Sequence, residues 1–186
     1  MGQYYRPIFK EPGYQKLTPN HYKYYIFDSG FKLMENSWLG NTEVEFLVKY
    51  LVNNPKHVVW AGDYADEKEH LGKTEYSYVS KDLTRRTRIR LNKKTRPKKY
   101  RYILNHTKQE YIDLSLYTEE VAGDRDGWII HPLPLLTADG NGRGGGDYRG
   151  PQEEYVGLWK DDLLEVKDYV PNNFVTLYFP IFFEDR

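Results

Sequence analysis

The sequence predicts a single α+β domain, residues 1–186, built on a mainly antiparallel sheet of about eight strands with one principal helix at about residues 43–53. Short segments in which apolar and polar side chains alternate recur along all 186 residues, and such alternation is typical of strands with one buried face. Eighteen tyrosines also favour strands, because the ring packs on the sheet while the hydroxyl stays hydrated. No linker divides the chain, so one domain is expected.

Two strands are expected near the N-terminus, at residues 1–9 and 21–27. A turn at residues 11–13, Glu-Pro-Gly, separates them, and they should pair with each other. Pro7 favours an edge position or a bulge, because proline has no N–H to donate to a sheet.

The principal helix follows. Thr42 and Glu45 form a capping-box pattern, and apolar residues then recur at helical spacing as far as Leu51. Pro55 lies just beyond the predicted end, where proline commonly follows a helix. The apolar stripe predicts packing against the sheet.

The rest of the chain is expected to supply further strands. Residues 100–104 and 111–117 alternate on either side of a turn and predict a hairpin. Residues 67–82 are polar and aromatic with little period. The other predicted strands are residues 56–60, 155–159, 163–166 and 174–183.

A basic segment stands apart from an acidic remainder. Between Arg85 and Arg101 there are ten Lys or Arg and no Asp or Glu, so the rest of this formally neutral chain carries a net charge of −10. We expect a basic β-hairpin or arm at about residues 84–101 that binds nucleic acid, docks on an acidic protein, or is simply solvated. Tyr100 and Tyr102 alternate with its cations, as in sites that stack bases beside phosphates. The candidate nucleic-acid-binding residues are Arg85, Arg86, Arg88, Arg90, Lys93, Lys94, Arg96, Lys98, Lys99 and Arg101.

A glycine-rich loop follows the apolar residues 132–136. Six of the eleven residues from Gly140 to Gly150 are glycines, interleaved with charged side chains. The N–H groups of such a loop can form an anion-binding nest; the alternative is a flexible surface loop. The loop is neither a P-loop nor a Rossmann fingerprint, because the residues after it lack Gly-Lys-Ser/Thr and a helical pattern. The candidate ligand- or phosphate-binding residues are Asp63, Asp139, Gly140, Asn141, Gly142, Arg143, Gly144, Gly145, Gly146, Asp147 and Arg149.

Metal-dependent phosphoester chemistry is a second interpretation of the same loop. Asp63, at the predicted end of a strand, could converge with Asp139 and Asp147 on Mg²⁺, with His131 nearby.

The wider chain gives this chemistry little support. Glu165 and Lys167 fit the acidic-x-Lys pattern of many nucleases, but that pattern arises often by chance in a chain with 29% charged residues. The five histidines have no metal-binding spacing and there is no cysteine. We therefore predict no resident metal or cofactor, with Mg²⁺ as the ion if the protein is an enzyme, and favour binding over catalysis.

Three motifs together resemble a group of proteins from phages, prophages and gut bacteria for which no activity is assigned. They are Met-Gly-Gln-Tyr-Tyr at residues 1–5, Trp-Ala-Gly-Asp-Tyr-Ala-Asp at residues 60–66, and Pro-Leu-Pro-Leu-Leu-Thr-Ala-Asp-Gly-Asn-Gly-Arg-Gly-Gly-Gly-Asp-Tyr at residues 132–148. The resemblance covers most of the chain except about residues 85–99, which look like an insertion. It implies a phage or mobile-element protein in a bacterial cytoplasm and assigns no catalytic residue.

These observations favour a phage-type accessory binding protein. Its basic arm would engage nucleic acid or a nucleic-acid-handling host defence complex, and its glycine loop would bind a ligand. The alternatives are a nucleotide-like small-molecule binder or a metal-dependent phosphoester enzyme at the loop, and a purely protein-binding inhibitor or immunity module. With no leader pattern and no apolar run of ~20 residues, a cytoplasmic location without a membrane partner is expected.

Overall fold

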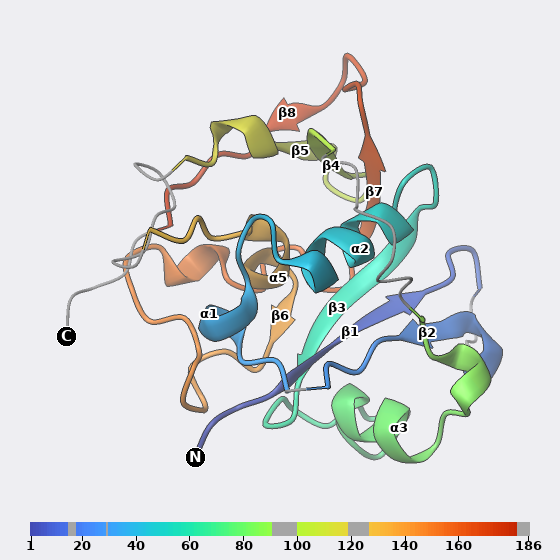
Figure 1. Cartoon of the computed structure of the whole chain (residues 1–186). Helices are drawn as coiled ribbons and strands as arrows, with labels where there is room; N and C mark the ends of the chain where they lie inside the picture. Colours follow the sequence, from blue (N-terminus) through green and yellow to red (C-terminus); the bar gives the residue numbers. More distant parts are fainter. Residues whose placement is uncertain (15–17, 29, 91–99, 119–126, 182–186) are drawn as a thin grey trace.

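One eight-stranded sheet forms the centre of the molecule. The computed structural model describes residues 1–14, 18–28, 30–90, 100–118 and 127–181. The strand order is β2-β1-β3-β7-β4-β5-β8, and β6 pairs with β3 off this path (Figure 1). The strands are β1 (Tyr5–Lys10), β2 (Tyr22–Tyr24), β3 (Lys56–Gly62), β4 (Tyr102–Asn105), β5 (Glu110–Asp113), β6 (Ala138–Asp139), β7 (Leu163–Lys167) and β8 (Val175–Thr176).

Most neighbouring strands are antiparallel, as the sequence predicts. β1 pairs with β2 and with β3, so the expected N-terminal pair is present. β4 pairs with β5 and with β7, and the hairpin predicted from residues 100–104 and 111–117 is the β4–β5 pair. The parallel pairs are β3 with β6 and β5 with β8. The α+β class and the mainly antiparallel sheet are confirmed.

One edge of β3 positions the glycine loop. The start of β3 pairs with β7, whereas its end pairs with β6, where Ala61 lies opposite Asp139. The glycine loop begins directly after β6, and Asp63 directly follows β3. The sheet therefore brings Asp63 and the start of the loop to the same end of the central strand.

The longest helix among the described residues is α2 (Thr42–Tyr50), the principal helix of the prediction. Asn41 rather than Thr42 caps it, because Asn41 Oδ1 accepts hydrogen bonds from the N–H groups of Glu43 (2.9 Å) and Val44 (3.1 Å). No helix in the described part of the chain is long and apolar enough to cross a bilayer. The remaining helical elements are α1 (Leu33–Asn36), α3 (Glu75–Lys81), α5 (Pro132–Leu136) and the 3₁₀ helices η1 (Pro19–His21), η2 (Arg85–Thr87), η3 (Leu114–Leu116) and η4 (Glu153–Tyr155).

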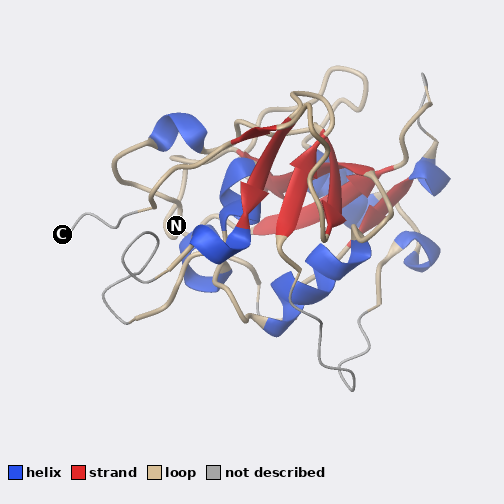
Figure 2. Cartoon of the chain, turned by 90° about the horizontal axis from the view of Figure 1, so that it is seen from above, coloured by secondary structure: helices blue, strands red, loops and turns tan. Residues whose placement is uncertain are grey.

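The sheet is covered on both faces, and Figure 2 shows helices on either side of the strands. Alternate residues of β3 define the two cores, because successive side chains point to opposite faces. Val58 and Trp60 pack in the larger core with the apolar residues of α2 and α5. Val59 and Ala61 pack in the smaller core with β2 and α3.

Two expectations for single elements are wrong, and one segment without a predicted element holds a helix. Residues 67–82 contain α3, a seven-residue helix too short to show a full apolar stripe in the sequence. Residues 155–159 are not a strand, because the chain turns at Gly157, where φ is +81°. Of the described residues after Phe174, only Val175 and Thr176 pair as a strand, β8.

The described residues at the two ends of the basic segment do not form the expected hairpin. Arg85–Thr87 is the 3₁₀ helix η2, and Arg88 then forms a parallel bridge with Tyr24 of β2. At the other end, β4 pairs with β5 and β7 instead of with residues 85–90. Residues 91–99, with Lys93, Lys94, Arg96, Lys98 and Lys99, lie outside the described part of the chain.

Candidate functional site

The glycine loop folds back onto the first residues of the chain. The N–H of Gln3 donates to Gly145 O at 3.0 Å, and the N–H of Gly145 donates to Met1 O at 2.9 Å. The N–H of Met34 donates to Gly146 O at 2.9 Å. Backbone hydrogen bonds therefore join the loop to the N-terminal residues and to the start of α1.

Close packing explains why glycine is needed at Gly144. A Cβ atom on Gly144 would lie 2.4 Å from the Cβ of Gln3 and 2.7 Å from its backbone nitrogen. Gln3 is fully buried, so the loop and the N-terminal segment cannot move apart without opening the core. At the neighbouring Gly145 the nearest atom would be 3.6 Å away, an ordinary contact. The need for glycine is thus local to particular positions of the loop.

Two successive N–H groups of the loop, where the sequence predicts an anion-binding nest, bind the carboxylate of the chain's own Asp147. Asp147 Oδ2 accepts hydrogen bonds from the N–H groups of Arg143 and Gly144, both at 3.0 Å. Its Oδ1 accepts from the Tyr5 hydroxyl at 2.8 Å. Burial raises the pKa of Tyr5, and the neighbouring Asp147 carboxylate raises it further, so this hydroxyl stays a donor. A ligand phosphate would have to displace a buried, fully bonded carboxylate.

The other two predicted carboxylates also have partners of their own. Asp139 is buried between two lysines, with Lys68 Nζ at 2.9 Å from Oδ2 and Lys160 Nζ at 3.1 Å from Oδ1. Burial lowers the pKa of Lys68, but the ion pair with Asp139 outweighs it and the net shift is upward. Asp63 Oδ1 accepts the N–H of Tyr4 at 3.1 Å.

Polar side chains of the loop form further hydrogen bonds and an ion pair. Asn141 Oδ1 accepts the N–H of Tyr148 at 2.9 Å, and its amide donates to Tyr148 O at 3.1 Å. Arg143 makes a bidentate ion pair with the exposed Asp66, at 2.7 and 2.8 Å. Arg149 is exposed at the loop's end.

The described residues give no support to a metal centre. No group of three or more His, Asp or Glu among them is placed to hold a metal ion. His131 is fully buried, and its Nδ1 accepts the N–H of Leu133 at 3.2 Å; burial lowers its pKa to about 3. Glu165 is bound by His106 (2.9 Å) and Lys167 (3.0 Å), so the acidic-x-Lys pattern is an ion pair within β7.

The described cations of the basic segment fall into two groups. Arg101 binds Asp113 through two nitrogens, and Arg88 Nη2 lies 3.8 Å from Asp28 and donates to Ile26 O at 3.3 Å. Arg85, Arg86 and Arg90 are exposed and form no ion pair with any described residue. Some of the described cations of this segment are thus paired within the chain, and others are exposed without an ion pair.

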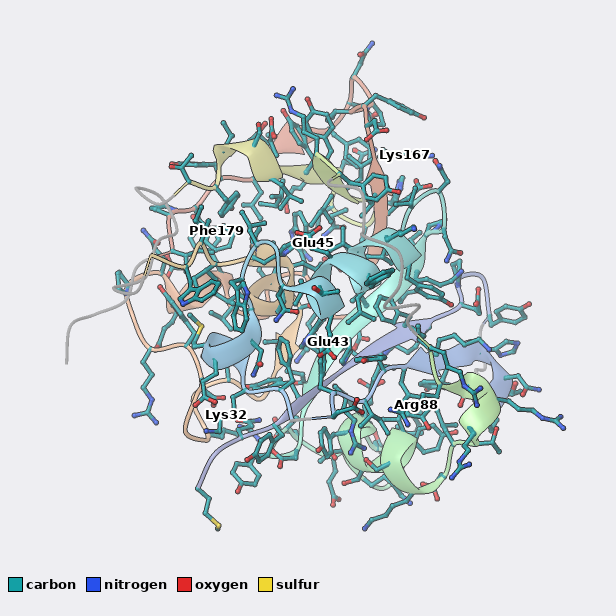
Figure 3. All side chains as sticks on the ribbon, in the orientation of Figure 1. Lys32, Glu43, Glu45, Arg88, Lys167 and Phe179 are labelled. Atoms are coloured by element: carbon teal, nitrogen blue, oxygen red, sulfur yellow. The ribbon has the colours of Figure 1, made fainter. Side chains whose placement is uncertain are left out.

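One lysine that the sequence prediction missed adds to this open group. Lys81 ends α3, four positions before η2 begins, and makes no ion pair within the described part of the chain. Lys23 on β2 does not belong to the group, because Tyr22 and Tyr24 on either side of it pack with α3 and Lys23 therefore points to the opposite face of the sheet. Figure 3 labels Arg88 on this side of the molecule, beside β2 and α3. We call Lys81, Arg85, Arg86 and Arg90 the basic edge.

The tyrosines expected to stack on bases are arranged differently. Tyr100 is half-buried in the wall of a cavity of about 490 Å³. Tyr102 meets Tyr111 edge to face, with 5.8 Å between ring centroids, and the Arg101 guanidinium lies 4.9 Å from the Tyr102 centroid. Neither ring stands free beside the basic edge.

Comparison of the chain with protein-family models, curated proteins and solved structures finds no match.

Proposed function

We propose that the protein binds nucleic acid, without catalysis, through the basic edge. The observation that carries this proposal is the group of exposed cations at one edge of the sheet that have no carboxylate partner in the described chain. Such cations release condensed counterions when they meet phosphates, which makes binding favourable and strongly dependent on salt.

The neighbouring acidic groups support the proposal because each already has a cation. Asp82 is bound by Lys73 at 2.8 Å, Asp28 lies 3.8 Å from Arg88, and the buried Glu75 is bound by Lys10 at 2.9 Å. Within the described part of the chain, these three acids are therefore already paired and do not neutralise the basic edge. Five further cations between residues 91 and 99 follow Arg90 directly in the sequence, which adds positive charge to the same segment.

The mode of binding follows from the residue types. Arginine forks match phosphate oxygens, and the basic edge has no free aromatic side chain beside it to read a base. We therefore infer binding to the phosphate backbone with little sequence preference.

The resemblance to phage proteins suits an accessory protein that covers nucleic acid or competes with a host complex for it. The glycine loop has no part in this proposal, because Asp147 already occupies its nest.

The test is a fluorescence-anisotropy titration of labelled 20-nucleotide DNA and RNA strands from 50 to 300 mM NaCl. We expect binding at low salt, with log K falling linearly against log salt by ~0.7 to 0.9 per phosphate contact. Arg85→Ala/Arg86→Ala/Arg90→Ala should weaken binding at least tenfold and reduce the slope. No binding at 50 mM NaCl, or equal binding by the variant, would refute the proposal. A host protein captured equally well after nuclease treatment would favour the protein-binding alternative instead.

A further inference from the structure

A cavity of about 490 Å³ lies between the segment that carries α2 and the segments that flank the β4–β5 hairpin. Leu39 and Glu45 line one side, and Tyr100, Leu114 and Tyr117 line the other. Its volume falls within the ~300–1,000 Å³ typical of small-molecule sites. None of the sequence patterns points to it, because its walls come from segments far apart in the chain.

Glu45 is the unusual residue of this cavity. It is 6% exposed, and its Oε1 accepts one hydrogen bond, from the N–H of Gly40 at 3.1 Å. No Lys, Arg or His among the described residues forms an ion pair with it. Figure 3 labels Glu45 on the side of α2 that faces β4 and β5.

Other buried carboxylates of the described chain show what Glu45 lacks. Asp113, Asp139, Asp162, Glu75 and Glu165 each have at least one cation partner. Asp147 has none but accepts three hydrogen bonds. Burying a carboxylate is costly unless it is paired or fully hydrogen-bonded, so Glu45 is incompletely compensated by the chain itself.

The arginine in the cavity wall does not supply the missing charge. Arg101 donates through Nε and Nη2 to Asp113 Oδ2, at 3.1 and 2.8 Å. Burial raises the pKa of Asp113, but the hydrogen bonds from Arg101 and Ser115 outweigh it and hold that pKa below its usual range. Asp168, a second acid without an ion pair in the described chain, also lines the cavity. Arg101 and Asp113 neutralise each other, so among the described lining residues the charges of Glu45 and Asp168 remain unpaired.

Apart from Ser115, which is hydrogen-bonded to Asp113, the remaining wall is apolar and aromatic. Leu39, Leu114 and Ile129 supply aliphatic surface, and Tyr100 and Tyr117 supply rings. A ring face attracts a cation as well as an apolar body. We propose that this cavity binds an organic cation, an ammonium or guanidinium group carried on an apolar body, with the cation on Glu45 and the body between the tyrosines.

The first test compares three probes of the same shape that differ in charge. They are 3-phenylpropylamine, 3-phenylpropanol and 3-phenylpropionate, titrated into the full chain by calorimetry or by protein-observed NMR. We expect saturable binding of the amine, at least tenfold weaker binding of the alcohol and none of the acid. Equal affinity for all three, or binding of none at millimolar concentration, would overturn the proposal.

Two variants locate the site. Glu45→Gln keeps an oxygen that can accept the Gly40 N–H but removes the charge, so the preference of amine over alcohol should disappear. Glu35→Gln is the control, because Glu35 is exposed on α1 and paired with Lys32 at 2.8 Å; the preference should persist. An unchanged preference in Glu45→Gln would overturn the assignment. If that variant folds poorly, Ile129→Trp, which fills the cavity from another wall, should abolish amine binding.

The cation could come from a free small molecule or from the side chain of a partner. An acetylated Ala-Ala-Lys-Ala-Ala peptide separates the two sources, because binding as tight as the amine's would identify a partner side chain. The inference is independent of the proposed nucleic-acid binding. Glu45→Gln should bind DNA as the wild type does, so failure of either proposal is visible without the other.

Discussion

The glycine loop and the basic edge are both rich in charge, yet the structure uses their charges in opposite ways. In the loop, Asp147 accepts three hydrogen bonds and Asp139 binds two lysines. At the basic edge, Arg85, Arg86 and Arg90 are exposed and unpaired within the described chain. A charged side chain that is paired within the chain stabilises the fold, whereas an exposed side chain without an ion pair remains available to bind a partner. The more conspicuous motif in the sequence is therefore the poorer candidate for a binding site.

Removing the central acceptor of the loop is the strongest way to test this difference. Asp147→Ala leaves the Tyr5 hydroxyl and two loop N–H groups without their acceptor, and each buried donor left unsatisfied costs about 1–3 kcal/mol. We expect a loss of roughly 4 kcal/mol in the free energy of unfolding, measured by urea denaturation. Asp66→Ala, which removes an exposed partner of Arg143, should cost far less, because solvent screens an exposed ion pair. Equal losses would mean that the nest is not a structural element.

His131 offers a test through pH. Its folded pKa of about 3 lies below the ordinary 6.5, so the unfolded chain takes up a proton between these values while the folded chain does not. Its contribution to stability is complete above pH 6.5 and is lost as pH falls toward 3, by about 1.4 kcal/mol per pH unit.

The variant for this test is His131→Asn, whose side chain can still accept the Leu133 N–H. Compared between pH 6.5 and 4.5, the wild type should lose about 2.5 kcal/mol more than the variant. Parallel pH profiles of the two proteins would show that His131 is protonated in the folded state and would restore it as a candidate functional group.

Two adjacent glycines give a smaller, sharper test of the loop's packing. Gly144→Ala places a methyl group 2.4 Å from the Cβ of Gln3, and overpacking of this kind costs roughly 1–3 kcal/mol. Gly145→Ala meets nothing closer than 3.6 Å and should change the midpoint of thermal unfolding by no more than a few degrees. Similar melting points for the two variants would contradict the close approach of loop and N-terminus.

The parts of the fold that could be predicted are those whose cause is local. The apolar spacing of α2 and the β-favouring residue types of β1, β3 and β7 are readable because they depend on a residue and its neighbours in the chain. The helix α3 could not be read, because seven residues with two buried side chains, Glu75 and Val79, show little period. The turn at residues 157–161 also escaped, since Asp161 takes a positive φ of 65° that its residue type does not announce.

The site was harder to predict because pairing is a long-range property. Glycines and acids mark the loop in the sequence. The hydroxyl that binds Asp147 of the loop, however, belongs to Tyr5, 142 positions away in the chain. Likewise Asp66, which neutralises Arg143, lies 77 positions away. Residue type gives the charge, and only the fold decides whether that charge is already bound.

A charge-matched pair of variants tests this account most directly. Arg85→Ala/Arg86→Ala/Arg90→Ala and Lys49→Ala/Arg143→Ala/Arg149→Ala each remove three cations, the first set from the basic edge and the second from α2 and the glycine loop. The measurement is the affinity for a labelled 20-nucleotide strand at 100 mM NaCl. We predict at least a tenfold loss for the basic-edge variant and less than a threefold loss for the other. Equal losses would mean that net charge alone drives binding, and a larger loss in the second variant would return the binding site to the glycine loop.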